Sequence, residues 1–308
     1  MIDVALGAMD FGTRVDEATS FRLLDCFVER GGEWIDTANC YSFWADASGV
    51  GGQSEEVIGR WLTSRPQLSD RVRISTKVRQ QPTTPHVWPE SAEGLSAEAI
   101  QSAARASLQR LRREHVDLYW AHAEDRGVPL QETVEALAAL CADGQVGRLG
   151  ASNHAVWRVE RARHLATDRG LTGFTALQYR HSYLFPRPWA PLPDAGHMLL
   201  TPEGLDYATS EDLELWFYTP LLHGSYVRDD RPFPEVYDHP GTTKRLTALD
   251  RVARETGRTR NQVVLAWLSA LAPHVRPIVG VSTVSQLEEA MDTTDLAIET
   301  RHLLDEAI

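Results

Sequence analysis

The sequence predicts an α/β fold, a (β/α)8 or TIM barrel formed as a single domain over residues 1–308. Short apolar segments typical of strands alternate with amphipathic helical segments eight times along the chain. One such barrel typically needs ~250 residues, so this chain is long enough to form it. An open doubly wound sheet is the alternative, but it normally carries a G-x-G-x-x-G turn after an early strand, and none follows a strand here.

The N-terminal half is predicted to hold four strands, each followed by a helix. The first strand, 2–6, leads through the segment 7–12 to a helix that Asp16 caps and that ends at Gly31 and Gly32. The apolar face of that helix holds Phe21, Leu24, Phe27 and Val28. The other strands and helices of this half are predicted at 34–36, 55–62, 72–77, 96–111, 116–120 and 130–142, with loops at 43–53 and 81–94.

The C-terminal half repeats the alternation with longer interruptions. Strands are predicted at 146–151, 174–178, 213–218 and 276–279. Thr201 and Pro202 are typical of a helix start and predict a short helix after the proline-rich stretch 186–193. The remaining helical segments are predicted at 154–168, 242–256, 261–271, 283–291 and 299–306, with a loop at 223–241.

The overall composition narrows the class of protein. With 31 basic and 43 acidic residues the formal charge is −12, which argues against nucleic-acid and anionic-membrane partners. The three cysteines, Cys26, Cys40 and Cys141, form no close-spaced pair, so neither a disulfide framework nor a zinc knuckle is indicated. The N-terminus has no basic leader, and no run approaches the ~20 apolar residues of a membrane span. A cytoplasmic protein is expected, and nothing here predicts its oligomeric state.

Three neighbouring strands end on residues that are capable of acid–base chemistry. Asp36, Lys77 and His122 close the second, third and fourth predicted strands, and Tyr41 begins the loop after the second. Taken singly, each is an ordinary polar residue at a strand end. In a parallel barrel, however, all strands open at their C-terminal ends onto one face, where active sites are built. The four side chains are therefore predicted to share one pocket.

The four residue types together can act as a proton-donating centre. A tyrosine hydroxyl, with a pKa near ~10, is a weak acid at neutral pH. A lysine ammonium about 4 Å away favours the phenolate by about 4 kcal/mol at an effective dielectric of ~20. This could lower the pKa of Tyr41 by up to ~3 units, although burial opposes the shift. Asp36 would keep Lys77 charged, and His122 could orient a substrate oxygen.

Lys77 has a second interpretation, as the Schiff-base nucleophile of a lyase on the same barrel. That role needs a depressed lysine pKa, and an adjacent carboxylate acts in the opposite direction. The proton relay is therefore favoured over the Schiff base.

Beyond these residues, the chain resembles the aldo-keto reductase family along nearly its whole length. The matching motifs lie at 31–41 (GGEWIDTANCY), 53–59 (QSEEVIG), 74–78 (ISTKV), 117–122 (DLYWAH), 150–154 (GASNH) and 218–221 (YTPL). The resemblance implies reduction of an aldehyde or ketone with a nicotinamide cofactor and without a metal. It also implies that Asp36, Tyr41, Lys77 and His122 form the catalytic tetrad, with Tyr41 as the proton donor.

The resemblance also assigns the residues that contact the nicotinamide half of the cofactor. Gly7, Ala8 and Met9 match the segment on the nicotinamide side, and Ser152, Asn153 and Gln178 match the partners of the carboxamide. Tyr218 matches the aromatic residue that stacks on the ring, and Thr219 and Leu221 match pyrophosphate contacts. Two alternatives stay open: Ser152 and Asn153 could cap the following helix, and Tyr218 could be ordinary strand packing.

The segment 280–290 resembles the family's adenosine-phosphate segment, with Ser282, Gln286 and Glu289 at matching positions. Thr283 and Gln286 would equally form a helix capping box. Many NADPH-preferring members carry Arg or Lys near Ser282, where this chain has hydroxyls, and Ala290 replaces the usual Asn. The resemblance implies NADPH, with NADH or the use of both as the alternative.

The long loops are predicted to frame a pocket for a small carbonyl substrate. Candidate lining residues are Phe43, Trp44, Trp88, Trp120 and residues near Trp189 and Tyr226. His154 and His181 could join His122 as metal ligands, but no close-spaced ligand motif is present, and no metal is predicted. The resemblance leaves one rival of a different class, a cofactor-binding regulatory protein like the potassium-channel β subunits.

Overall fold

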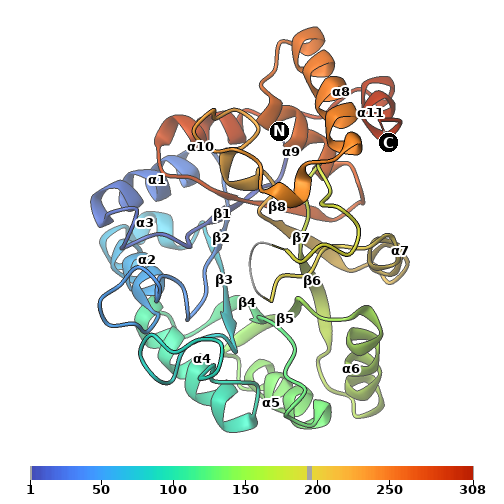
Figure 1. Cartoon of the computed structure of the whole chain (residues 1–308). Coiled ribbons are helices and arrows are strands. Elements are labelled where there is room, and N and C mark those ends of the chain that lie inside the picture. The colour runs from blue at the N-terminus through green and yellow to red at the C-terminus, as the bar shows by residue number, and fades with distance from the viewer. Residues whose placement is uncertain (1, 193–195, 308) are drawn as a thin grey trace. The chain divides into compact units, whose positions relative to one another are not determined.

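The computed structural model describes residues 2–192 and 196–307, and it confirms the predicted fold class. Eight strands follow one another in a closed barrel in the order of the sequence (Figure 1). They are β1 Ala5–Gly7, β2 Trp34–Asp36, β3 Arg73–Val78, β4 Val116–Ala121, β5 Val146–Ser152, β6 Phe174–Arg180, β7 Glu214–Tyr218 and β8 Val275–Gly280.

Helices alternate with these strands, as predicted. They are α1 Glu17–Glu29, α2 Gln53–Ser64, α3 Pro66–Ser69, α4 Ala97–Leu111, α5 Leu130–Ala142, α6 Val156–Asp168, α7 Pro202–Ser210, α8 Pro240–Thr256, α9 Arg260–Ser269, α10 Val284–Met291 and α11 Ile298–Asp305. Short 3-10 helices cover Leu222–Gly224 and Glu235–Tyr237. Among the residues that the structure describes, no helix is both long and apolar enough to cross a membrane.

The chain divides into two compact units. The larger unit comprises Ala5–Gln178 and Val281–Val284, and the smaller unit comprises Met1–Val4, Tyr179–Gly280 and Ser285–Ile308. In the larger unit, α1, α2, α4, α5 and α6 lie outside the parallel strands (Figure 1). The smaller unit contains the parallel pair β7 and β8, in which Phe217 lies opposite Pro277.

The register of the strands in the larger unit brings together the C-terminal ends of β1 to β4, where the predicted tetrad residues lie. Asp36 pairs with Ser75 across β2 and β3, and Lys77 pairs with Trp120 across β3 and β4. Asp36 also pairs with Gly7 of β1. The C-terminal ends of β1 to β4 therefore open side by side, as the barrel prediction requires.

The predicted helix starts are largely confirmed by their capping bonds. Asp16 accepts a hydrogen bond from the Thr19 amide, and Ser96 accepts one from Ala99. Thr201 caps α7, with Pro202 in its first turn. These bonds satisfy amides that have no partner inside the helix.

Some boundaries differ from the prediction. The first strand begins at Ala5 rather than Ile2, and the Ile2 amide instead donates to the carbonyl of Thr293 within the smaller unit. Helix α6 begins at Val156, with Ala155 at its cap, so Ser152 and Asn153 do not cap it. The short helix α3, which starts at Pro66, was not predicted. Pro193, the last residue of the predicted proline-rich stretch, lies outside the described residues.

Helix α2 packs closely against the C-terminal end of α4, and both helices are bonded to β3. A Cβ added at Gly59 would lie 2.0 Å from the Arg110 carbonyl oxygen, so only glycine fits there. The fully buried Glu55 accepts bonds from Thr76 Oγ1 at 2.5 Å and from Arg110 Nε at 2.7 Å. This carboxylate ties both helices to β3, one residue before Lys77.

Candidate active site

Three of the four predicted tetrad residues are joined directly at the strand ends of the larger unit. Lys77 Nζ donates to Asp36 Oδ2 at 2.5 Å and to the Tyr41 hydroxyl oxygen at 2.8 Å. The Lys77 nitrogen also lies 4.6 Å from the centre of the Tyr41 ring. The structure thus brings the phenol, the ammonium and the carboxylate into one chain of contacts.

The Asp36 carboxylate is held by a residue that the sequence did not single out. Ser75 Oγ donates to Asp36 Oδ1 at 2.7 Å, and Gln178 Nε2 lies 3.4 Å from the same oxygen. Ser75 precedes Lys77 by two residues on one strand, so both side chains project from the same face. That two-residue spacing was a usable signal for Ser75. Gln178 reaches Asp36 from β6, and only the closed barrel reveals this contact.

Burial dominates the electrostatics of the buried pair. It lowers the pKa of Lys77 below its ordinary value, and the neighbouring Asp36 carboxylate opposes this shift. Asp36 was expected to keep the lysine charged, and desolvation is the larger effect. The ammonium form of Lys77 nevertheless fits its surroundings. Its three N–H donors match three oxygen acceptors, namely Asp36 Oδ2, the Tyr41 hydroxyl and the Thr37 carbonyl.

The contact of Lys77 with the Thr37 carbonyl argues against the Schiff-base interpretation. Lys77 Nζ donates to the Thr37 carbonyl at 2.8 Å in addition to Asp36 and Tyr41, and the side chain is fully buried. A lysine nucleophile needs an unprotonated nitrogen with room for a carbonyl carbon to approach. Here that nitrogen is surrounded by its three acceptors, and this geometry suits a proton relay instead.

His122 lies beside Tyr41, and its ring is oriented by a buried thiol. The rings of Tyr41 and His122 meet edge to face, with centroids 5.8 Å apart. Cys40 Sγ lies 3.7 Å from His122 Nδ1, and burial raises the pKa of this thiol far above its ordinary range. The neutral thiol can donate to Nδ1, which would leave the proton on Nε2. The sequence prediction missed Cys40, although it precedes Tyr41 directly.

The residues predicted to bind the carboxamide lie next to this centre. Ser152 and Gln178 are register partners in β5 and β6, and the Asn153 amide nitrogen donates to the Gln178 carbonyl at 3.1 Å. Asn153 Nδ2 donates to Ser152 Oγ at 3.1 Å and to the His122 carbonyl at 3.1 Å. All three side chains are buried. The side-chain amides of Asn153 and Gln178 and the hydroxyl of Ser152 offer both hydrogen-bond donors and acceptors, as a bound carboxamide group requires.

Gly7 is the last residue of β1, and Ala8 and Met9 follow it at the C-terminal end of the strand. The Ala8 amide donates to the Asp36 carbonyl at 2.9 Å, and the Ala8 carbonyl accepts from Ser54 Oγ at 2.7 Å. The Met9 carbonyl accepts from Ser42 Oγ at 2.8 Å, and the Met9 side chain is 36% exposed. Backbone bonds thus fix this segment next to Asp36, while the Met9 side chain stays accessible.

The other predicted cofactor residues are distributed over both units. In the smaller unit, Tyr218 ends β7, its hydroxyl accepts from the Met198 amide at 3.3 Å, and its ring meets that of His197 edge to face. Thr219 and Leu221 follow it. Thr219 has a left-handed backbone with φ of 55°.

The adenosine-phosphate residues are divided in the same way. Gln286 and Glu289 lie on α10 in the smaller unit, where Glu289 accepts from Asn261 Nδ2 at 3.3 Å. Ser282 belongs to the larger unit and is exposed.

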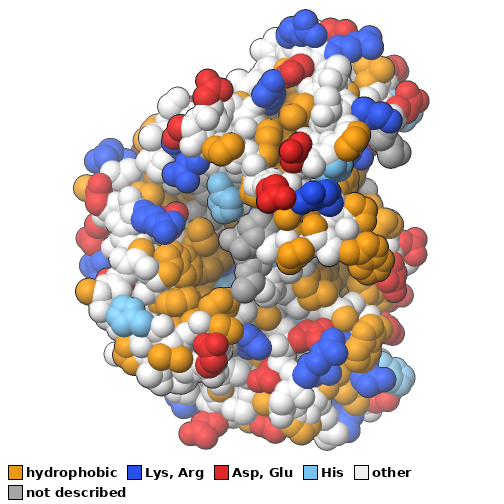
Figure 2. Space-filling view, viewed as in Figure 1, with side chains coloured by type: hydrophobic (Ala, Val, Ile, Leu, Met, Phe, Trp, Pro, Cys, Tyr) orange, Lys and Arg blue, Asp and Glu red, His pale blue; other side chains and the backbone are white. Residues whose placement is uncertain are grey.

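The aromatic candidates for the substrate pocket divide into two groups. Phe43 lies 5.0 Å from Trp44 and 6.0 Å from Trp88, measured between ring centroids, and Trp44 lies 6.4 Å from Tyr41. Figure 2 shows hydrophobic side chains gathered left of centre on this face, over the loops that follow β2 and β3. We name Tyr41, Trp44, Phe43 and Trp88 the aromatic wall.

The remaining aromatic candidates do not belong to this wall. Trp120 is fully buried in β4 and is a core residue. Tyr226 is fully buried in the smaller unit, where its hydroxyl contacts Ser182 Oγ at 2.8 Å and the Leu184 amide at 3.0 Å. Trp189 is fully exposed.

The loop 81–94 is anchored to the turn that carries Tyr41, a feature the sequence did not predict. Glu93 Oε1 accepts from Asn39 Nδ2 at 2.6 Å and from the Arg79 amide at 2.7 Å. Burial raises the pKa of this carboxyl group, and the hydrogen bonds oppose the shift. One carboxylate therefore fixes the far end of a long loop two residues from the predicted proton donor.

His154 and His181 are buried in separate surroundings. His154 Nδ1 lies 2.7 Å from the Ser152 carbonyl, and His181 packs against Phe217 and Trp267 within the smaller unit. Within the described ranges 2–192 and 196–307, no cluster of three or more His, Cys, Asp or Glu side chains could hold a metal ion.

Burial of His154 predicts a pH dependence of stability. Burial lowers its pKa from 6.5 to about 4, so the unfolded chain takes up this proton first as the pH falls. The stabilisation is complete above the unfolded pKa and is lost as the pH falls toward 4. For this residue we expect a loss of about 2 kcal/mol in unfolding free energy between pH 7 and pH 5. Urea unfolding at both pH values measures it.

A matched pair of variants isolates the effect. His154→Gln should show a drop between pH 7 and pH 5 that is smaller by about that amount. His164→Gln replaces an exposed histidine on α6, with 69% of its side chain accessible, and should leave the drop unchanged. Equal pH dependence in wild type and His154→Gln would show that His154 does not contribute.

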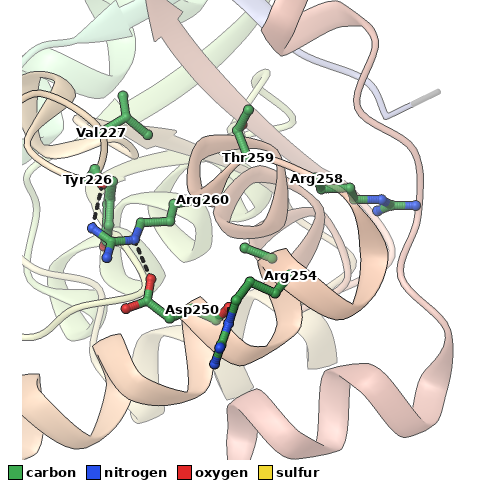
Figure 3. Close-up of a pocket in the computed structure, with 8 residues that line it drawn as sticks. Tyr226, Val227, Asp250, Arg254, Arg258, Thr259 and Arg260 are labelled. Carbon is green, nitrogen blue, oxygen red and sulfur yellow. Dashed lines mark hydrogen bonds and ion pairs between the residues drawn. The ribbon is translucent and has the colours of Figure 1, made fainter.

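A hollow of about 690 Å³ in the smaller unit lies where α8 ends and α9 begins (Figure 3). Arg260 Nε donates to Asp250 Oδ1 at 2.5 Å, and its Nη1 donates to the Tyr226 carbonyl at 2.9 Å. Arg258 binds the carbonyls of Thr294 and Asp295. Figure 3 shows Arg254 and Arg258 pointing away from Arg260, so the three guanidinium groups do not converge. No tetrad residue or predicted cofactor residue lines this hollow.

Comparison with known proteins gives similarity over nearly the whole chain. The sequence model described as "Aldo/keto reductase family" matches residues 3–306. The chain is 28% identical over 303 residues to the uncharacterized oxidoreductase YrpG of Bacillus subtilis, covering 96% of this chain and 88% of that protein. It is 30% identical to a norsolorinic acid reductase of Emericella nidulans, covering 96% and 74%. It is 27% identical to an aryl-alcohol dehydrogenase [NADP(+)] of Phanerodontia chrysosporium, covering 97% and 80%.

Proposed function

Because the chain belongs to the aldo/keto reductase family and its relatives include oxidoreductases, we propose that it reduces an aldehyde or ketone to the alcohol. In this proposal the hydride comes from NADPH and the proton comes from Tyr41. The relatives named above are oxidoreductases, a reductase and a dehydrogenase, which favours an enzyme over a cofactor-binding regulatory protein.

The observation that carries the proposal is the contact between Lys77 and the Tyr41 hydroxyl at 2.8 Å. The Tyr41 oxygen accepts this bond, so the hydroxyl can still donate its own proton. As that proton leaves, the ammonium stabilises the growing negative charge on the phenol oxygen. Asp36 holds Lys77 in place, and His122 orients the carbonyl oxygen through its ring nitrogen.

Three polar residues beside the tetrad in the larger unit fit the carboxamide group of a nicotinamide. Ser152, Asn153 and Gln178 would hold that carboxamide, and the family resemblance assigns Tyr218 to the nicotinamide ring. When bound, the reduced nicotinamide supplies the hydride that the carbonyl carbon accepts. The exposed hydroxyl of Ser282 can bind a phosphate group without a counter-charge. NADPH, which the family resemblance implies, is proposed as the main cofactor and NADH as a weaker one, and one relative carries the name aryl-alcohol dehydrogenase [NADP(+)].

The substrate class follows from two independent sources of support. The aromatic wall leads from Tyr41 to Trp88, and aromatic rings prefer to pack edge to face or offset against one another. Two relatives carry the names of enzymes that act on norsolorinic acid and on aryl alcohols. We therefore propose that this chain acts on aromatic carbonyl compounds.

The test combines turnover with cofactor binding. With a panel of benzaldehydes and aryl ketones, we expect loss of the absorbance band of reduced nicotinamide, faster with NADPH than with NADH. Titration of the protein's tryptophan fluorescence with each cofactor gives the two dissociation constants independently of turnover. We expect NADPH to bind at least about tenfold more tightly, because the 2′-phosphate adds charge-assisted hydrogen bonds.

Two results would count against the proposal. Tight NADPH binding without turnover on any carbonyl compound would point to a regulatory protein. Equal affinity for both cofactors would remove the NADPH preference and leave the reductase proposal intact.

A further inference from the structure

Arg79 occupies a backbone conformation that few residues adopt, two positions beyond Lys77. Its φ is 112°, which costs roughly 1–3 kcal/mol for a residue with a side chain. The Glu93 carboxylate holds this conformation by accepting from the Arg79 amide at 2.7 Å, and the Gly94 amide donates to the Arg79 carbonyl at 3.3 Å. The loop thus fixes the direction in which the arginine side chain leaves β3.

The guanidinium is only partly satisfied by protein groups. Its Nη1 donates to Gln80 Oε1 at 2.8 Å, whereas its Nε is buried and has no hydrogen-bond partner among the described residues. Within the same part of the chain, no carboxylate forms an ion pair with it, in contrast to Arg110, which pairs with Glu55. A buried donor on a charged group is costly when it lacks an acceptor. A bound anion would supply that acceptor.

Gln80 connects this guanidinium to the aromatic wall. The same oxygen, Gln80 Oε1, lies 3.3 Å from Trp88 Nε1. Trp88 is the end of the wall that continues through Phe43 and Trp44 to Tyr41. A charged donor therefore lies at one end of an apolar surface, and the predicted proton donor lies at the other.

The side chain also lies on the correct side of the strands. The positive charge of Arg79 is among the causes that lower the pKa of His154 to about 4. Arg79 itself directly follows β3, which ends at Val78, so it lies at the C-terminal end of that strand, as the predicted tetrad residues do.

We propose that Arg79 binds a carboxylate on the substrate, which makes an aromatic aldehyde or ketone with a ring carboxylate the preferred substrate class. The planar guanidinium would bind the carboxylate in a bidentate pair, while the aromatic ring packs along the wall and the carbonyl group reaches Tyr41. This inference rests on the proposed reduction for its catalytic part only, because carboxylate binding can be measured without turnover.

The test uses two substrates that differ by one charge. These are 4-carboxybenzaldehyde and its methyl ester, and the measured quantity is the ratio of their kcat/KM values. In Arg79→Met we expect kcat/KM for the acid to fall by about 10–100-fold and that for the ester to stay within about threefold. Arg79→Lys keeps the charge and should give an intermediate ratio, since it cannot form the bidentate pair.

A matched control removes an arginine from another surface of the larger unit. Arg22 is exposed on α1, and its Nη2 donates to Thr19 Oγ1 at 2.7 Å, so Arg22→Met should leave the ratio unchanged. Equal losses on acid and ester in Arg79→Met, or no loss on either, would overturn the assignment. Neither result would affect the proposed reductase activity.

A binding measurement covers the case in which no carbonyl compound is reduced. Quenching of tryptophan fluorescence by 4-carbamoylbenzoate and by its methyl ester reports carboxylate preference alone. A preference for the acid that disappears in Arg79→Met would support the site even without catalysis. The absence of any such preference in the wild type would refute it.

Discussion

Replacing Tyr41 with phenylalanine is expected to lower kcat by about 10²–10⁴-fold, the contribution of a positioned general acid. The phenylalanine ring can keep its edge-to-face contact with His122, so the shape of the site is preserved. Lys77 loses one of its three acceptors and keeps Asp36 and the Thr37 carbonyl. We expect NADPH affinity to stay within about twofold, since no proposed cofactor contact is removed. Steady-state kinetics and fluorescence titration measure the two effects.

Tyr119 offers a matched control for the loss of a phenolic hydroxyl. It is buried in β4, and its hydroxyl has no hydrogen-bond partner among the described residues. Tyr119→Phe should therefore change kcat by less than about twofold, because no bond is broken. If Tyr41→Phe kept activity near that of this control, Tyr41 would not be the proton donor.

Replacing Lys77 with methionine is expected to affect activity and stability together. Loss of the ammonium removes up to about 4 kcal/mol of stabilisation from the forming phenolate, so kcat should fall by up to about a thousandfold. It also leaves the buried Asp36 carboxylate without its cation. Removing one partner of a buried pair typically costs about 3–5 kcal/mol of folding free energy. Urea unfolding and kcat on the same preparation measure both consequences.

A double variant separates the two effects. Asp36→Asn combined with Lys77→Met removes the unpaired charge, so most of the lost stability should return. Activity should not return, because the ammonium is still missing. If the double variant recovered activity along with stability, the role of Lys77 would be structural, and the proton relay would be wrong.

The grouping of the predicted catalytic residues could be foreseen because three of them lie at or next to the C-terminal end of a strand, and the parallel strands of a barrel end on one face. Asp36, Lys77 and His122 are far apart in sequence, yet the order of elements alone predicts that they are neighbours. Ser75 could also have been found from its two-residue spacing to Lys77. The direction of the Lys77 pKa shift could not be predicted from the sequence. It depends on how completely burial removes water from Lys77 and Asp36, and so on whether desolvation outweighs the attraction of the carboxylate.

The loop 81–94 shows what the sequence could not reveal. Loops lack the periodic pattern that predicts strands and helices, so the contacts of Glu93, Gln80 and Arg79 depend on the folded path of the chain. For the same reason Trp88 and Trp120 looked equivalent as pocket candidates. Trp88 packs against Phe43 in the aromatic wall, whereas Trp120 is fully buried in β4.

The bonds of Glu93 have a consequence for how this enzyme could diversify. Because Glu93 ties the end of the loop to Asn39 and to the Arg79 amide, we expect changes of sequence or length between residues 82 and 91 to leave Tyr41 in place. Natural drift or directed evolution could then retune what the enzyme accepts while leaving its chemistry intact. Libraries confined to that interval should yield new selectivities at a low rate of inactive clones, whereas changes at Glu93 itself should not.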